Sequence, residues 1–326
     1  MYDDPKLEEQ LLTDLCSAGL PNWPDCQVLL TSRSPNWTHV SVMPVSGFTE
    51  DEGMQFAQRM LPDVPHADLH LLCVTLGFHP LALCQAIGYL QKTKRGIAAY
   101  VNAYKSSHRL RGSEAATTLD GYGLTIEATV ALATEQFLQD KRAAGGLALR
   151  IVDHIAFLAA TPLPTSVLRR FVTSRHWPGN VDEAISLCED YGLLQRVDGT
   201  VLMHQMHELT AEVRRGSVLV EQHAEIRADW IHMFYNMFST LRKITRESLH
   251  NLSLVYQHAE TVCKEWRESQ PAVVVDAPPA LRNDWTLLSY CHYHLAHYWS
   301  VDVMTAFNAC LLVFTIQEII FLQFCD

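Results

Sequence analysis

Residues 76–83, LGFHPLAL, mark the junction between two predicted helices. Gly77 tolerates the left-handed conformation that ends a helix, so the helical segment 68–76 is expected to stop there. Pro80 suits the first position of the next helix because its missing N–H is not needed at that position. In this second helix, predicted over residues 80–91, one face is apolar and consists of Leu83, Ala86, Ile87 and Leu90. The junction therefore predicts consecutive helices, the second of which buries one face.

On the N-terminal side, strand-like and helix-like segments alternate. The apolar run 28–30 is typical of a buried parallel strand, and a second short strand is predicted at 40–45. Arg33 follows the first strand, at the strand end where open α/β sheets bind their ligands. Thr49 is expected to open a helix, because Glu52 lies three residues later and completes a capping box.

On the C-terminal side, a stretch rich in Gly, Ser, Thr and Ala between 110 and 125 is predicted to be a linker. Helices are expected after it, over residues 126–139, 143–160, 165–172 and 181–191, with a break at the prolines of 161–164. The alternating segment 192–206 contains Asp198-Gly199, the signal for a hairpin with a two-residue type I′ turn. Helices followed by such a two-stranded wing favour a winged helix.

From residue 217 the pattern is helical to the end, apart from a Pro- and Ala-rich break at 271–279. Segments 249–262 and 287–298 carry Leu, Ala and Tyr at helical spacing, which predicts tetratricopeptide-like repeats.

Residues 305–324 are nearly all apolar and approach the roughly 20 residues of a membrane span. Polar side chains interrupt this segment and no basic residue follows it, so a repeat helix or an unnatural chain end is preferred over a membrane span.

The composition is that of a folded protein, since 48% of the residues are hydrophobic and 19% are charged. A formal net charge of −11 without a basic patch argues against nucleic acid as a partner. The nine cysteines include no Cys-x-x-Cys pair, as expected for reduced thiols in a cytoplasmic protein. The first residues, MYDDP, have no signal-peptide character and are expected to lie in the middle of a domain.

Three segments occur in a characteristic order, namely QVLLTSR at 27–33, LGFHPLAL at 76–83 and Met-His-Glu at 206–208. Their order and spacing resemble the second half of a STAND-type, NB-ARC-like nucleotide switch, and the resemblance covers about residues 1–215. It implies a mainly α fold with a partial α/β segment. The implied domains are the remnant of a P-loop NTPase domain with its helical lid (1–110), a helical and winged-helix domain (111–216) and a helical tetratricopeptide-like region (217–326).

The resemblance also implies nucleotide-binding residues near the phosphates. Arg33, with Ser32 beside it, is similar to the sensor arginine that approaches the γ-phosphate, a role that suits the permanent charge of a guanidinium group. Asp4 resembles a remnant of the region next to the Mg²⁺-associated strand. No Gly-x-x-x-x-Gly-Lys-Ser/Thr occurs in the chain, so the phosphate-binding loop is expected before Met1. Independent catalysis by this chain is therefore not expected.

Two further positions follow from the same resemblance. Pro80, followed by Leu81, would pack against the adenine. His207 would reach the β-phosphate of ADP and hold the closed state, with Glu208 in place of the family's Asp. The expected function is thus an ADP/ATP-dependent signalling switch, with Mg²⁺ in complete relatives. Its lids would open for self-assembly or for signalling to protein partners bound by the repeats.

Other interpretations of the same residues stay open. The chain could be a non-enzymatic interaction scaffold with a vestigial nucleotide domain, and His207 could be a simple helix cap. A winged-helix DNA-binding regulator is disfavoured, because the candidate recognition helix carries only acidic charges, at Asp182, Glu183, Glu189 and Asp190. The histidines of the segment 292–297 share a helix face but are interpreted as part of a repeat helix and not as a metal site.

Overall fold

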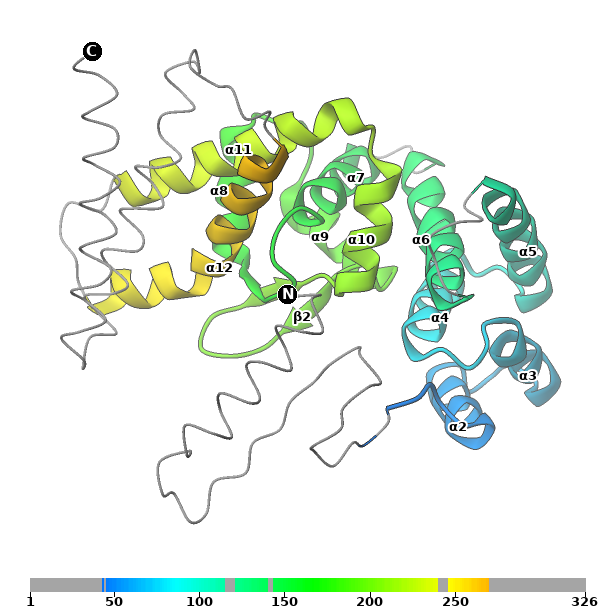
Figure 1. The fold of residues 1–326 in the computed structure, drawn as a ribbon. Helices are drawn as coiled ribbons and strands as arrows, with labels where there is room; N and C mark the ends of the chain where they lie inside the picture. The colour runs from blue at the N-terminus through cyan, green and yellow to red at the C-terminus, as the bar shows by residue number, and fades with distance from the viewer. Residues whose placement is uncertain (1–42, 44, 115–120, 140–142, 240–245, 270–326) are drawn as a thin grey trace, which may run out of the picture. The chain divides into compact units, whose positions relative to one another are not determined.

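The computed structural model describes residue 43 and residues 45–114, 121–139, 143–239 and 246–269, and this part of the chain is mainly helical (Figure 1). The first helices are α2 (Glu50–Met60), α3 (His66–Thr75), α4 (Pro80–Thr93), α5 (Ile97–Glu114) and α6 (Gly121–Gln139). They are followed by α7 (Ala143–Ile155), β1 (Leu163–Pro164), α8 (Thr165–Ser174), α9 (Val181–Asp190), β2 (Gln195–Val197) and β3 (Met203–Gln205). The last elements are α10 (Glu208–Ser217), α11 (Val220–Ser239) and α12 (Arg246–Ser269). The expectation of a mainly α fold is confirmed.

The capping box predicted at the start of α2 is present. The Thr49 hydroxyl accepts a hydrogen bond from the Glu52 backbone N–H at 3.3 Å, and a Glu52 carboxylate oxygen accepts one from the Thr49 N–H at 2.9 Å. These reciprocal bonds satisfy two backbone donors that the first turn of a helix leaves without partners. The Thr49 side chain thereby sets the residue at which α2 begins.

The junction between α3 and α4 also has the predicted geometry. Gly77 has a φ of 61°, and Phe78 continues the left-handed turn with a φ of 54°. The Phe78 N–H donates to the carbonyl oxygen of Cys73 at 2.9 Å, which closes the C-terminal end of α3. Pro80 is the first residue of α4, as expected. The predicted apolar face of α4 (Leu83, Ala86, Ile87 and Leu90) is buried.

The predicted linker at 110–125 is wrong at both of its ends. Helix α5 continues to Glu114, and α6 already begins at Gly121. The two helices pack along each other, and α6 lies between α5 and α10 (Figure 1). Helix α5 includes Gly112 and Ser113, and α6 begins at Gly121, although these residues have weak helix propensity.

Residues 143–205 contain a small antiparallel sheet packed with helices. The strand order is β1-β3-β2. His204 of the central strand β3 pairs with Leu163 of β1 on one side and with Arg196 of β2 on the other. Helix α7 ends at Ile155 and not at residue 160, because tight turns follow, such as the bond from the Phe157 N–H to the His154 carbonyl. The proline segment 161–164, predicted only as a break, supplies the edge strand β1.

The hairpin predicted around Asp198-Gly199 is present, but its turn is not of type I′. Val197 pairs with Met203, so residues 198–202 form the loop, and neither Asp198 nor Gly199 has the positive φ that a type I′ turn needs. The Leu202 carbonyl accepts the Thr165 N–H at 3.0 Å and the Thr165 hydroxyl at 2.9 Å. Leu202 thus pairs with the start of α8, and the hairpin cannot tighten around Gly199.

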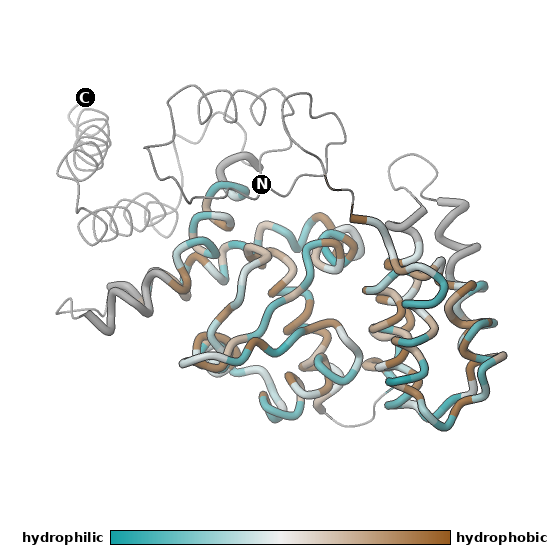
Figure 2. The backbone as a smooth tube through the Cα atoms, turned by 90° about the horizontal axis from the view of Figure 1, so that it is seen from below, coloured by the Kyte–Doolittle hydropathy of each residue, from teal (hydrophilic) through white to brown (hydrophobic). Residues whose placement is uncertain are grey.

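Helices α10, α11 and α12 complete the described chain. Trp230 in α11 stacks on Phe171 of α8, with ring centroids 3.8 Å apart, and its indole N–H donates to the His154 carbonyl at 2.8 Å. Helix α12 packs along α11, where Arg227 donates to Glu265 at 3.2 Å, and it also contacts β1. In Figure 2, hydrophobic and hydrophilic residues alternate along the helices, as expected when each helix buries one face.

One hydrophobic core extends from Met54 in α2 to Trp266 in α12. The described residues from Phe48 onward belong to one compact unit. Among the described residues, no helix combines the length and the apolar character needed to cross a membrane. The predicted strand 28–30, the apolar segment 305–324 and the histidines of 292–297 lie outside the described residues.

Candidate functional site

The structure describes half of the residues predicted to bind nucleotide. Pro80 and Leu81 form the first turn of α4, both partly buried, and Leu81 packs against the core. His207 is the exposed N-cap residue of α10. Arg33, Ser32 and Asp4 lie outside the described residues.

A histidine caps each of the two helices that carry these positions. The Ala82 N–H donates to Nδ1 of His79 at 3.4 Å, and the Leu209 N–H donates to Nδ1 of His207 at 3.2 Å. His207 therefore has the local capping role that was one of the two interpretations of this residue. Capping occupies only Nδ1, so the exposed ring can still present Nε2 to a ligand.

A buried polar group joins α4 to α10 a short distance beyond both helix starts. Nε2 of Gln85 in α4 donates to the hydroxyl of Thr210 in α10 at 3.1 Å. The hydroxyl of Thr129 in α6 donates to Oε1 of the same amide at 2.5 Å. All three side chains are buried, so both ends of the Gln85 amide are satisfied inside the protein. We refer to Thr129, Gln85 and Thr210 as the Gln85 network.

Close backbone packing holds α4 against the end of α9. A Cβ atom on Gly88 would collide with the carbonyl oxygen of Asp190, so only glycine allows this approach. Gly192 has a φ of 65°, and a Cβ there would lie 3.3 Å from the Cα of Gln85. Lys92 forms an ion pair with Asp190 across the same interface. Helix α4 is thus fixed to α9 and α10 by both shape and hydrogen bonds.

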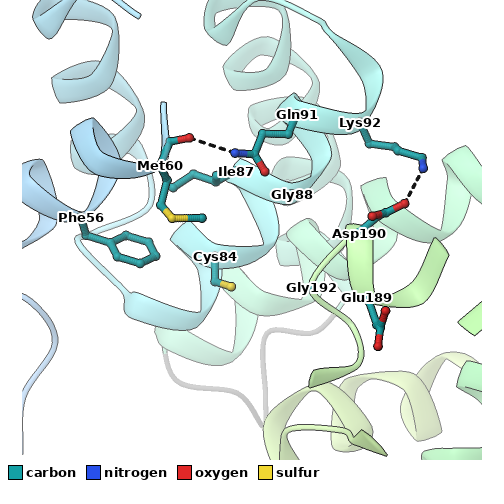
Figure 3. Close-up of a pocket in the computed structure, with 10 residues that line it drawn as sticks. All are labelled: Phe56, Met60, Cys84, Ile87, Gly88, Gln91, Lys92, Glu189, Asp190 and Gly192. Atoms are coloured by element: carbon teal, nitrogen blue, oxygen red, sulfur yellow. Dashed lines mark hydrogen bonds and ion pairs between the residues drawn. The ribbon is translucent and has the colours of Figure 1, made fainter. Parts of the chain in front are cut away.

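A cavity of about 370 Å³ opens beside this interface, between α2, α4 and the end of α9 (Figure 3). Its lining is partly apolar and partly charged, and consists of Phe56, Met60, Cys84, Ile87, Gly88, Gln91, Lys92, Glu189, Asp190 and Gly192. Gln91 donates to the Met60 carbonyl at 2.9 Å, which ties α4 to the end of α2 on one side of the cavity. Neither Pro80 nor His207 lines this cavity, so it is separate from the predicted nucleotide positions.

Thr165, His204 and Glu189 form a hydroxyl, imidazole and carboxylate series. Nδ1 of His204 lies 2.8 Å from the Thr165 hydroxyl, and Nε2 lies 2.7 Å from Oε1 of Glu189. A catalytic triad has the same three groups. Thr165 and His204 are each only 3% exposed, so a substrate cannot reach the hydroxyl. The series instead fixes β3 between α8 and α9.

Helix α10 is held to α7 by a largely buried ion pair. Nε of Arg214 donates to Oδ1 of Asp153 at 2.9 Å, and Nη2 of Arg214 contacts the same oxygen. Burial raises the pKa of Asp153, while the adjacent Arg214 charge opposes that rise. The helix that begins at His207 is therefore anchored at its far end as well as at Thr210.

The Gln85 network and the α4–α9 packing were not foreseen from the sequence. A glutamine on a helix gives no signal of its partners, and Gly88 resembles an ordinary helical glycine. Among the described residues, no group of three or more His, Cys, Asp or Glu side chains is placed to hold a metal ion. In comparisons with known proteins, no family model matches the chain and no curated protein sequence is similar to it.

Proposed function

We propose that this chain is part of a STAND-type switch that binds ADP or ATP and transmits its bound state to protein partners in the cytoplasm. In this proposal α2 to α5 belong to the helical lid, α6 to α10 form the helical and winged-helix domain, and α11 with α12 begins a helical-repeat region. The order of a helix, a strand, two helices and a hairpin, with β3 central in the sheet, supports the winged-helix assignment.

The observation that carries the proposal is the Gln85 network. Pro80 and His207 were predicted to contact opposite parts of one nucleotide, and Gln85 and Thr210 lie shortly after them in the same two helices. Because Gln85 donates to Thr210 and both helices pack on α6, the two helices are already held together. Such docking is what a closed state held by ADP requires of the lid and the winged helix.

The nucleotide would act by favouring this docked arrangement. Pro80 and Leu81 would contact the adenine, and His207 would donate from Nε2 to the β-phosphate while Nδ1 caps α10. Arg33, with Ser32, would meet the γ-phosphate of ATP, and Asp4 would lie toward Mg²⁺. A ligand shifts a conformational equilibrium only through contacts that differ between the two states. Contacts to two separate helices provide such a difference, because separation of the helices would break the nucleotide's contacts to one of them.

The 326 residues contain no phosphate-binding loop motif, so the proposal concerns binding and docking and not hydrolysis.

A scaffold function is the second candidate, and the α11–α12 pair favours it. Arg227 donates to Glu265 between these helices and lies over the ring of Phe157, 5.2 Å from its centroid. Trp230 anchors the pair to α8. A helix pair fixed in this way is a suitable first unit of a stacked array that binds protein partners. In this function, nucleotide would have no effect on docking.

Calorimetric titration with ADP and ATP separates the two functions. The chain should be titrated beside a version extended upstream through the expected phosphate-binding loop. Binding by the extended form supports the switch, and absence of binding by both forms contradicts it and leaves the scaffold.

DNA binding is not proposed, because the exposed residues of α9 include Asp182 and Glu183 and its apolar residues face α7.

Two variants of His207 make the test specific. His207→Asn keeps an acceptor for the Leu209 N–H, because asparagine is a favourable N-cap, but it is too short to reach a phosphate. His207→Ala removes both the cap and the ring. If His207 contacts the nucleotide, both variants should weaken ADP binding about equally, while only His207→Ala lowers thermal stability. If His207 is only a cap, His207→Asn should bind ADP as the parent does.

A further inference from the structure

We propose that the cavity between α2, α4 and the end of α9 binds a small organic cation with an apolar body, of the alkylammonium class. The inference is independent of nucleotide binding, because neither Pro80 nor His207 lines the cavity. It rests on the shape of the cavity, its apolar wall and the charge at its rim.

The apolar wall is formed before any ligand arrives. Phe56 and Met60 come from α2 and Ile87 from α4, and all three line the cavity (Figure 3). The ring of Phe56 is held by Phe48, with centroids 5.5 Å apart, and the Met60 carbonyl is held by Gln91. A volume of about 370 Å³ is at the lower end of the range for small-molecule pockets. The occupant therefore needs an apolar body of only a few carbon atoms.

The rim of the cavity is electronegative. Glu189 and Asp190 lie at the C-terminal end of α9, where the helix dipole adds further negative potential. Among the described residues that line the cavity, Lys92 is the basic one, and it is paired with Asp190. Glu189 is paired with His204 and Asp190 with Lys92, but both carboxylates are partly exposed, so a soluble cation can approach them. An anion would meet the same carboxylates and the same helix end, which disfavour it.

A second ammonium group can compete with Lys92 for Asp190. The Lys92 and Asp190 side chains are 37% and 38% exposed, so their pair is solvated and contributes little to stability. An alkylammonium would reproduce this pair and also bury its chain against Phe56 and Ile87. Removing Lys92 should therefore strengthen binding, a result that a purely apolar pocket would not give.

Cys84 provides a reporter inside the cavity. It lines the cavity and is exposed, whereas Cys73, Cys188 and Cys263 are buried. Cys84 is accessible to a reagent, but partial desolvation of its thiol raises the pKa of Cys84, so its alkylation by iodoacetamide is slow enough to follow by peptide mass mapping. An occupant should protect Cys84, and a small free thiol such as N-acetylcysteine, alkylated in the same solution, would show whether the reagent itself is affected.

The experiment compares n-hexylammonium, n-hexanol and n-hexanoate on the full chain at equal concentrations. We expect n-hexylammonium to slow the alkylation of Cys84, with n-hexanol less effective and n-hexanoate without effect. Equal protection by n-hexylammonium and n-hexanol would overturn the assignment of a cation, as would stronger protection by n-hexanoate. No protection by any of the three would overturn the site itself.

Charge variants complete the test. Lys92→Met should tighten n-hexylammonium binding and Asp190→Asn should weaken it, each by roughly threefold to tenfold, as expected for one partly exposed charge. Arg169→Met is the matched control, because it removes the same charge from an exposed ion pair with Asp182 at the other end of α9. If Lys92→Met and Arg169→Met change the affinity equally, or if Asp190→Asn has no effect, the rim does not recognise a cation and the proposal is wrong.

Discussion

Gln85 and Thr210 are 125 residues apart in the sequence, yet the amide of Gln85 donates a buried hydrogen bond to the hydroxyl of Thr210. Thr129 completes the network from α6. The bond links the helix that begins at Pro80 to the helix that begins after His207. The docking of these two helices is the structural basis of the proposed switch.

Replacing Gln85 by Leu should destabilise the protein by about 1–3 kcal/mol, because it leaves the buried Thr210 hydroxyl without its donor. Urea denaturation measures this change. In a double-mutant cycle with Thr210→Val, the coupling energy should be about 1 kcal/mol in favour of the native pair. A coupling energy near zero would show that the contact does not hold α4 to α10.

Gly88→Ala should destabilise the protein by about 1–3 kcal/mol, because the added methyl group collides with the Asp190 carbonyl and forces α4 from α9. Gly146→Ala in α7 is the matched control, since a Cβ there meets no atom within 4 Å. That change should stabilise the protein by about 0.5–1 kcal/mol through helix propensity alone. Melting temperatures that rise in both variants would contradict the close packing of α4 and α9.

Asp153→Ala should cost about 3 kcal/mol, because it leaves the largely buried Arg214 without its counter-ion. The exposed pair of Arg169 and Asp182 is the control, and Asp182→Ala should change the stability by no more than about 0.5 kcal/mol. Adding Arg214→Met to Asp153→Ala should restore part of the loss. Similar costs for Asp153→Ala and Asp182→Ala would show that the buried pair has no special role in anchoring α10.

The protein should lose stability as the pH falls from 6.5 toward 4, and His258 is one cause. Burial in α12 lowers the pKa of His258 to about 4 from the ordinary value of 6.5, because its charged form has no solvation there. Between these two values the unfolded chain binds the proton more tightly, so acid favours unfolding, by up to about 3 kcal/mol in total. His258→Leu should flatten the pH dependence of urea unfolding over this window. Parallel curves for the parent and His258→Leu would assign the acid sensitivity to other groups.

Local features of this fold could be read from the sequence because they depend on neighbouring residues. The capping box of Thr49 and Glu52, the turn at Gly77 and the start of α4 at Pro80 each involve residues within a few positions of one another. The hairpin was also predictable, but its turn was not, because the Leu202 carbonyl pairs with Thr165 far earlier in the chain.

Long-range features were beyond a reading of one sequence. Periodicity marks Gln85 as lying next to the apolar face of α4, but it cannot name Thr129 or Thr210 as its partners. Gly88 gave no signal, since its role depends on a carbonyl of α9. Of the predicted nucleotide positions, Pro80, Leu81 and His207 could be placed in the structure, and their contact with a nucleotide stays a prediction.

Amide hydrogen exchange of α4 and α10, measured with and without ADP on the chain and on its upstream-extended form, tests the central claim most directly. We expect ADP to slow exchange in both helices together, because it would bridge their starts and oppose the opening of the Gln85 network. Unchanged exchange in both helices in both forms would contradict the proposed switch, and so would an effect confined to one helix.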